Sequence, residues 1–123
     1  MRDWKPIFIE NSWVPKVLSC FSPISIDAIT LGFIVFGRAQ MDDKVRQHET
    51  IHFQQFLETL FVGFLILYFY DYICGRFKYR DSTMAYYNIR AEREAYENEK
   101  TTDYLTHRIR WKWMRNWKNE TII

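Results

Sequence analysis

The spacing of hydrophobic residues along this chain changes near residue 40. Before that point lie two short runs rich in Ile, Val, Phe and Thr, at Lys5–Glu10 and Ala28–Phe36, and Gly37 follows the second run. Three prolines punctuate the same stretch, and proline is tolerated better in turns and at strand edges than inside helices. The pattern therefore predicts that residues 1–40 are mainly β structure, with the two runs as strands.

After residue 43 the hydrophobic residues recur at helical spacing. Asp42 or Asp43 is the expected N-cap, because a carboxylate there can accept hydrogen bonds from the free amides of the first helical turn. The helix either continues into the apolar segment Leu60–Tyr70 or breaks near Gly63. Gly75 is its expected end, since glycine adopts the left-handed closing conformation cheaply.

Further helices are predicted toward the C-terminus. A helix capped by Asp81 or Ser82 is interrupted at Asn88, whose side chain competes for backbone hydrogen bonds, and residues 91–100 have strong helix propensity. The apolar positions of a last helix recur every four residues, at Leu105, Ile109, Trp113 and Trp117. The predicted fold class is α+β: one domain over residues 1–123, with a small N-terminal β-sheet (1–40) followed by helices (44–118).

Composition fits one small globular domain. The chain has 123 residues, of which 48% are hydrophobic and 19% aromatic, so its core is modest and a bound metal would stabilise it. A net charge of +2 argues against nucleic acid as a partner. Cys20 and Cys74 form no disulfide framework and are expected to be free buried thiols. The first residues lack the apolar stretch of a secretory signal, which predicts a cytoplasmic location.

The sequence His48-Glu49-Thr50-Ile51-His52 falls on the first predicted helix. Residues four apart share one face of a helix, so His48 and His52 can direct two imidazoles at one metal ion. Glu49 lies beside that face, too offset to be a ligand but placed to reach a water on the metal, as a general base would be. Because the motif lies on a helix, as the chemistry requires, it indicates a zinc site rather than a surface helix with two solvated histidines.

A catalytic zinc ion needs a third protein ligand and one open position. His107 stands alone near a basic tail and is a weak candidate, whereas the acidic cluster of residues 92–99 is a stronger source. On a helix, one face of this cluster would carry Glu92, Ala95, Tyr96 and Glu99. The glutamates expected to be solvated and to pair with neighbouring cations are Glu94, Glu97 and Glu99.

Together the two motifs resemble the gluzincin pattern, in which HExxH is followed one helix later by Glu-x-x-Ala-Asp. CAAX prenyl endopeptidases show this arrangement, and the chain is similar in size to the minimal gluzincins and to small uncharacterised bacterial HExxH proteins. The resemblance implies a zincin-like fold in which His48, His52 and Glu92 bind Zn2+ and Glu49 is the general base. It also implies that Ala95 lets the two helices approach closely.

Tyr96 departs from this pattern. It stands where the family has an acid that supports a ligand histidine, and its phenol can hydrogen-bond there but supplies no negative charge. Gln55, three residues after His52 on the same helix, is a second residue expected to support a ligand from the outer shell.

The resemblance also implies parts that would hold a substrate. In such enzymes an edge strand beside the active-site helix pairs with extended peptide, and Leu31–Phe36 is expected in that role, with an ordinary core strand as the alternative. The side chains considered for stabilising an oxyanion are Tyr86, Tyr87, Arg90 and His107.

We therefore expect a zinc metallopeptidase with a peptide or protein substrate. The alternative is a weakly active or inactive zinc-binding module that acts by protein or membrane-surface association. Leu60–Tyr70 is short for a span of about 20 residues, so a core helix is favoured over a membrane span, with peripheral membrane contact as the alternative. The Trp- and Lys/Arg-rich tail Arg108–Lys118 is expected to pack on the core, with peripheral membrane contact as the second interpretation and nucleic-acid binding as the weakest.

Overall fold

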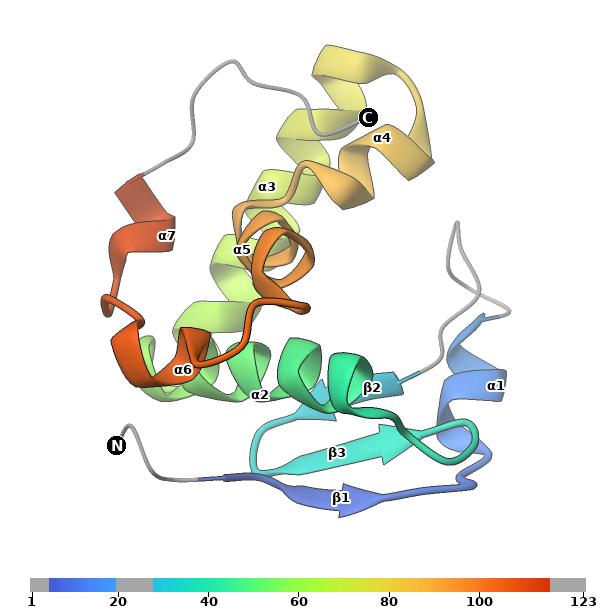
Figure 1. The fold of residues 1–123 in the computed structure, drawn as a ribbon. Coiled ribbons are helices and arrows are strands. Elements are labelled where there is room, and N and C mark those ends of the chain that lie inside the picture. Colours follow the sequence, from blue (N-terminus) through green and yellow to red (C-terminus); the bar gives the residue numbers. More distant parts are fainter. Residues whose placement is uncertain (1–4, 20–27, 116–123) are drawn as a thin grey trace.

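A three-stranded sheet lies beneath a group of helices (Figure 1), and the computed structural model describes residues 5–19 and 28–115. The strands are β1 (Ile7–Ile9), β2 (Ala28–Leu31) and β3 (Ile34–Gly37), in the order β1-β3-β2. β1 runs parallel to β3, and β2 runs antiparallel to it. The predicted α+β class is thus confirmed, with the sheet in the N-terminal third and helices after it.

Two details of the predicted β region are wrong. Residues Val14–Ser19 form a short helix, α1, because Pro15 lies in its first turn, where proline costs no hydrogen bond, and Ser12 Oγ accepts from the Val14 amide at 3.1 Å. The second predicted strand is a hairpin that turns at Gly32, whose φ of +67° favours glycine. The segment expected to be an edge strand, Leu31–Phe36, therefore contains this turn and most of the central strand β3.

The long helix α2 (Asp43–Glu58) lies between the sheet and a later helix, α5 (Arg90–Asn98) (Figure 1). Asp42 is its N-cap and accepts a hydrogen bond from the Val45 amide at 2.9 Å, as predicted. Side chains around most of the helix circumference are buried from His48 to Glu58, since β2 covers one side and α5 another. Polar side chains on α2 are therefore enclosed within the protein.

α2 ends before Gly63. Leu60 and Phe61 adopt left-handed φ values of 55° and 64°, and the chain bends by 112° into α3 (Val62–Tyr79). Gly75 does not end α3. It lies inside the helix, and a Cβ there would lie 3.1 Å from Ala85 of α4 (Ser82–Tyr87), so its small size permits close packing of α3 against α4.

The predicted C-terminal amphipathic helix is wrong within the described residues. Two short helices, α6 (Tyr104–His107) and α7 (Lys112–Arg115), flank a segment in which Arg108 is buried and Ile109 is exposed. Buried Trp113 joins the main apolar cluster, whose buried members are Phe56, Phe64, Ile89, Ala91 and Trp113. Trp117 lies outside the described residues.

The remaining predictions on thiols and membrane segments have mixed outcomes. Cys74 is half-buried rather than buried, and Cys20 lies outside the described residues. No single helix in the described part of the chain is long and apolar enough to cross a membrane, whereas α2 and α3 taken as a bent pair pass that test of length and composition.

Candidate metal centre

The middle of α2 carries a buried group of metal-binding side chains. His48, Glu49 and His52 each offer a ligand atom, and these atoms lie within 4.8 Å of one another. The two imidazoles are four residues apart and so project from one face of the helix, with their ring centroids 4.9 Å apart. This group could hold a metal ion.

α5 brings a second carboxylate to the same point. Glu92 Oε1 lies 3.3 Å from His48 Nε2 and 3.1 Å from His52 Nε2. The start of α5 is fixed by buried Asp71 of α3, which accepts hydrogen bonds from the Arg90 backbone amide at 3.1 Å and from its guanidinium at 2.9 Å. Both imidazole Nε2 atoms thus face one carboxylate oxygen from a separate helix.

Gln55 determines which nitrogen of His52 faces that point. Its amide nitrogen donates to Glu94 Oε1 at 2.7 Å and to the Ala91 carbonyl at 3.1 Å, so its amide oxygen faces His52 Nδ1 at 2.8 Å. Because that oxygen only accepts, Nδ1 must donate. The lone pair of neutral His52 therefore lies on Nε2, toward Glu92, which is the tautomer that metal binding requires.

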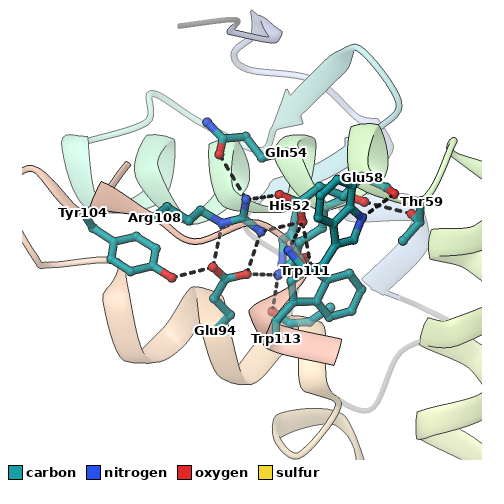
Figure 2. Close-up of polar contacts among 11 residues, drawn as sticks. His52, Gln54, Glu58, Thr59, Glu94, Tyr104, Arg108, Trp111 and Trp113 are labelled. Atoms are coloured by element: carbon teal, nitrogen blue, oxygen red, sulfur yellow. Dashed lines mark hydrogen bonds and ion pairs between the residues drawn. The ribbon is translucent and has the colours of Figure 1, made fainter. Parts of the chain in front are cut away.

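Glu94 belongs to a buried ionic cluster that the sequence did not reveal (Figure 2). Arg108 donates to Glu94 from Nε at 2.6 Å and from a terminal nitrogen at 3.0 Å, and it also pairs with Glu58 on α2. The expectation that Glu94 is solvated is thus wrong, because the C-terminal segment folds back over α5 and covers it. Exposed Glu97 fits that expectation.

His48 has a different outer partner. Glu99 is also buried, contrary to expectation, and its Oε2 lies 3.6 Å from His48 Nδ1 with no hydrogen-bond partner among the described residues. The Tyr96 ring packs against the His48 ring at 4.5 Å, and its hydroxyl lies 3.1 Å from that of Tyr86. Glu99 thus supplies beside His48 the negative charge that Tyr96 cannot.

Two further contacts hold the carboxylates in place. Thr30 of β2 donates to the side chain of Glu49 at 3.2 Å and lies 3.1 Å from the Glu49 carbonyl. Tyr68 of α3 donates to Glu92 Oε2 at 2.6 Å, leaving Oε1 directed at the histidines. Elements from both halves of the chain therefore orient the group.

The structure separates the side chains considered for oxyanion stabilisation. Arg90 is engaged with Asp71 and donates to the Met114 carbonyl at 2.6 Å, and His107 is exposed at the end of α6. Tyr86 and Tyr87 lie one layer out, in ring contact with Tyr96. Tyr96, which was not in this set, is the tyrosine whose ring contacts His48 directly.

Sequence reasoning missed several residues around the group. Their contacts come from segments far apart in the chain: Thr30, Tyr68, Glu94, Glu99 and Arg108. Glu99 had a usable signal, since it shares the helical face of Glu92. For Thr30, Tyr68 and Arg108 no local pattern exists, because only the packing of separate elements brings them close.

Burial and mutual charge shift the pKa values of these groups. Burial alone lowers the pKa of His48, but the neighbouring carboxylates of Glu92 and Glu99 outweigh it and raise that pKa to about 10. At His52, burial also lowers the pKa, but the charge of Glu92 outweighs this effect and the pKa rises. For Glu92, the raising effect of burial is exceeded by the histidine charges, so its pKa falls far below the usual range. Burial raises the pKa of Glu49, making it a stronger proton acceptor.

These shifts predict that stability falls with rising pH in the metal-free protein and changes much less with zinc bound. The metal-free folded protein keeps a proton on His48 that the unfolded chain releases near pH 6.5, so we expect its melting temperature to fall as pH rises from 6.5 to about 10. Metal binding displaces those protons, so the extra stability given by added zinc should grow over the same range, by about tenfold in affinity per pH unit and proton displaced. Thermal melts with chelator and with zinc, across this range, measure both slopes. Parallel slopes would contradict the assignment.

Comparison of the chain with protein-family models, characterised proteins and solved structures finds no match in any of the three. Support for a function therefore comes from the motif residues and the geometry in which they meet.

Proposed function

We propose that this protein is a zinc-dependent metallopeptidase. The observation that carries the proposal is the convergence of His48, His52 and Glu92, from two separate helices, beside the buried carboxylate of Glu49. Two histidines and a glutamate are a ligand set of catalytic zinc sites, which keep a fourth position open.

The surrounding side chains fit a divalent cation. Three buried carboxylates, Glu49, Glu92 and Glu99, lie around two imidazoles, so neutral histidines would leave several negative charges enclosed without compensation. Each ligand histidine has its Nδ1 directed at an outer acceptor, Gln55 or Glu99, as expected for Nε2 ligands. When bound, zinc would supply Lewis-acid polarisation of a carbonyl and would lower the pKa of a bound water toward about 7.

Glu49 is proposed as the general base rather than as a ligand. Its Oε2 lies 3.7 Å from His48 Nε2, farther than Glu92 Oε1, and its Oε1 is held by Thr30. With its pKa raised by burial, the carboxylate would take a proton from the attacking water and return it to the leaving amine.

An extended peptide is the substrate we propose, held along β2. This strand is one of the two edges of the described sheet, it packs against α2, and its Thr30 touches Glu49. A peptide paired with an open strand edge would gain main-chain hydrogen bonds there. The role assigned to Leu31–Phe36 from the sequence therefore moves to Ala28–Leu31.

A second candidate is a zinc-binding module without peptidase activity. The observation that favours it is Tyr96 beside His48, where the resembled family has an acid. Zinc bound in full amount with no cleavage across a broad peptide library would support this candidate over the peptidase.

The ligand assignment is tested by measuring zinc in purified protein. We expect one equivalent in the wild type, and a loss of affinity in His48→Ala and Glu92→Ala greater than the roughly 10–100-fold typical of outer-shell changes. Glu97→Ala, an exposed glutamate on the same helix, is the matched control and should retain zinc. Stoichiometric zinc in Glu92→Ala would remove Glu92 from the ligand set.

A further inference from the structure

The outward side of α3 is apolar where a surface helix is normally polar. Large hydrophobic side chains recur on it at spacings of three and four residues, so they form one stripe along the helix. We call this stripe the α3 outer face, and its exposed residues are Val62, Leu65, Ile66, Phe69, Tyr70, Ile73 and Phe77. Phe77 is 81% exposed, Ile66 63% and Phe69 62%.

The opposite side of α3 meets the rest of the protein. Phe64 packs in the apolar cluster, Asp71 caps α5, and Gly75 contacts α4. The helix is therefore already anchored on its inner side, and the outer face is not needed for packing within the described chain. A patch of this extent on a protein surface usually marks an interaction site.

Charge distinguishes between possible occupants of the α3 outer face. Arg76, three residues after Ile73, is an exposed cation at the C-terminal end of this face, while the only acid of α3, Asp71, is buried. Lys78 is also exposed, but two residues farther along it projects from the other side of the helix. The N-terminal end, near Val62, has no charged side chain. A second copy of the chain would set Arg76 against Arg76 in a parallel pair, or against an uncharged end in an antiparallel pair, so neither arrangement neutralises its charge.

We propose that the α3 outer face binds the surface of an anionic lipid membrane, with α3 lying in the plane of the interface. Apolar side chains would enter the boundary between headgroups and acyl chains, and Arg76 would pair with anionic headgroups. No residue crosses the bilayer in this arrangement. Tyr68, on the inner side of the same helix, holds Glu92, so the metal centre would lie roughly one helix diameter, about 10 Å, from the lipid.

Vesicle flotation tests the proposal directly. We expect wild-type protein to float with vesicles of mixed phosphatidylcholine and phosphatidylserine, and much less with phosphatidylcholine alone. Phe69→Ser with Phe77→Ser should weaken binding at least about tenfold, because two exposed aromatic side chains no longer enter the lipid. Trp13→Ser is the matched control, since Trp13 is 71% exposed outside the face, and it should bind as the wild type does.

Substitution of the cations of α3 tests how far charge contributes to vesicle binding. Arg76→Gln should weaken binding to the phosphatidylserine vesicles by about fivefold, with a smaller effect in high salt. Lys78→Gln, on the other side of the helix, should weaken it less. Zinc content and cleavage of a soluble peptide should not change in any of these variants, so failure here is distinguishable from failure of the proposed peptidase function. Absence of flotation with both vesicle types, or a wild-type dimer in light scattering that the two Phe substitutions dissociate, would overturn the proposal.

Discussion

Glu49→Gln is expected to lose peptidase activity by about 10²–10⁴-fold in kcat/KM while it still binds one zinc equivalent. The amide has nearly the shape of the carboxylate but cannot accept the proton of the attacking water. Thr30 can still donate to the oxygen of the new amide in place of Glu49 Oε1, so β2 should remain in contact with α2. The measurement is steady-state cleavage of a peptide that the wild type hydrolyses, together with zinc analysis of the same samples.

Two further variants separate the roles of the carboxylates. Glu92→Ala should lose both zinc and activity, whereas Glu97→Gln, exposed on the same helix, should lose neither. Zinc loss in Glu49→Gln would instead make Glu49 a ligand, a choice its closeness to the two histidines allows. Full activity in Glu49→Gln would remove it as the base.

Arg108→Met is expected to give the largest loss of stability, about 3–5 kcal/mol in the free energy of unfolding. The methionine fills the space of the Arg108 stem, but Glu58 and Glu94 are then left buried without their cation. Figure 2 shows both carboxylates turned toward the Arg108 guanidinium, with the Trp113 indole donating to Glu58 at 2.9 Å. A domain of this size is stable by only about 5–15 kcal/mol in total, so this loss is a large fraction of its stability.

The same cluster is coupled to the metal centre. Arg108 orients Glu94, Glu94 accepts from Gln55, and Gln55 accepts from His52 Nδ1. In the folded fraction of Arg108→Lys, which keeps the charge but loses the two-pronged hydrogen bonding, we expect zinc affinity to fall by roughly 10–100-fold.

Urea unfolding and zinc titration measure these two effects. Arg110→Met is the matched control, because Arg110 is exposed two residues farther along, and it should change stability by less than about 0.5 kcal/mol. An Arg108→Met protein as stable as the wild type would show that the buried cluster contributes little. Unchanged zinc affinity in Arg108→Lys would show that the Arg108 cluster does not influence zinc binding at His52.

Local chemistry made part of this protein predictable. Asp42 caps α2 and Asp81 caps α4 because an N-cap needs only a short acceptor beside the first turn. His48 and His52 share a face because the helical repeat sets that geometry, and the same repeat aligns Glu92 with Glu99 on α5. Gln55 follows His52 by three residues, so the helical repeat also brings the Gln55 side chain into contact with His52.

Predictions failed where a residue's role depends on what packs against it. From the sequence, Gly75 looks like the end of a helix. In the structure it lies within α3, where the absence of a side chain lets Ala85 of α4 pack closely against the helix. The sequence suggests that Glu94 and Glu99 are solvated. In the structure both are buried, because Arg108 packs against Glu94 and His48 packs against Glu99. Similarly, the Trp-rich tail forms no single stripe, because buried Arg108 interrupts it.

By itself, the sequence determined the α+β class, the helix that carries His48 and His52, and the caps, since each depends on residues within one or two turns of chain. The tertiary structure alone decided that Glu92 of α5 meets those histidines, that Thr30 and Tyr68 orient the carboxylates, and that α3 leaves an apolar side uncovered. The physical reason is that helical periodicity fixes the direction of a side chain relative to its own axis. It does not fix which other element lies opposite, because that depends on how all the faces are buried together.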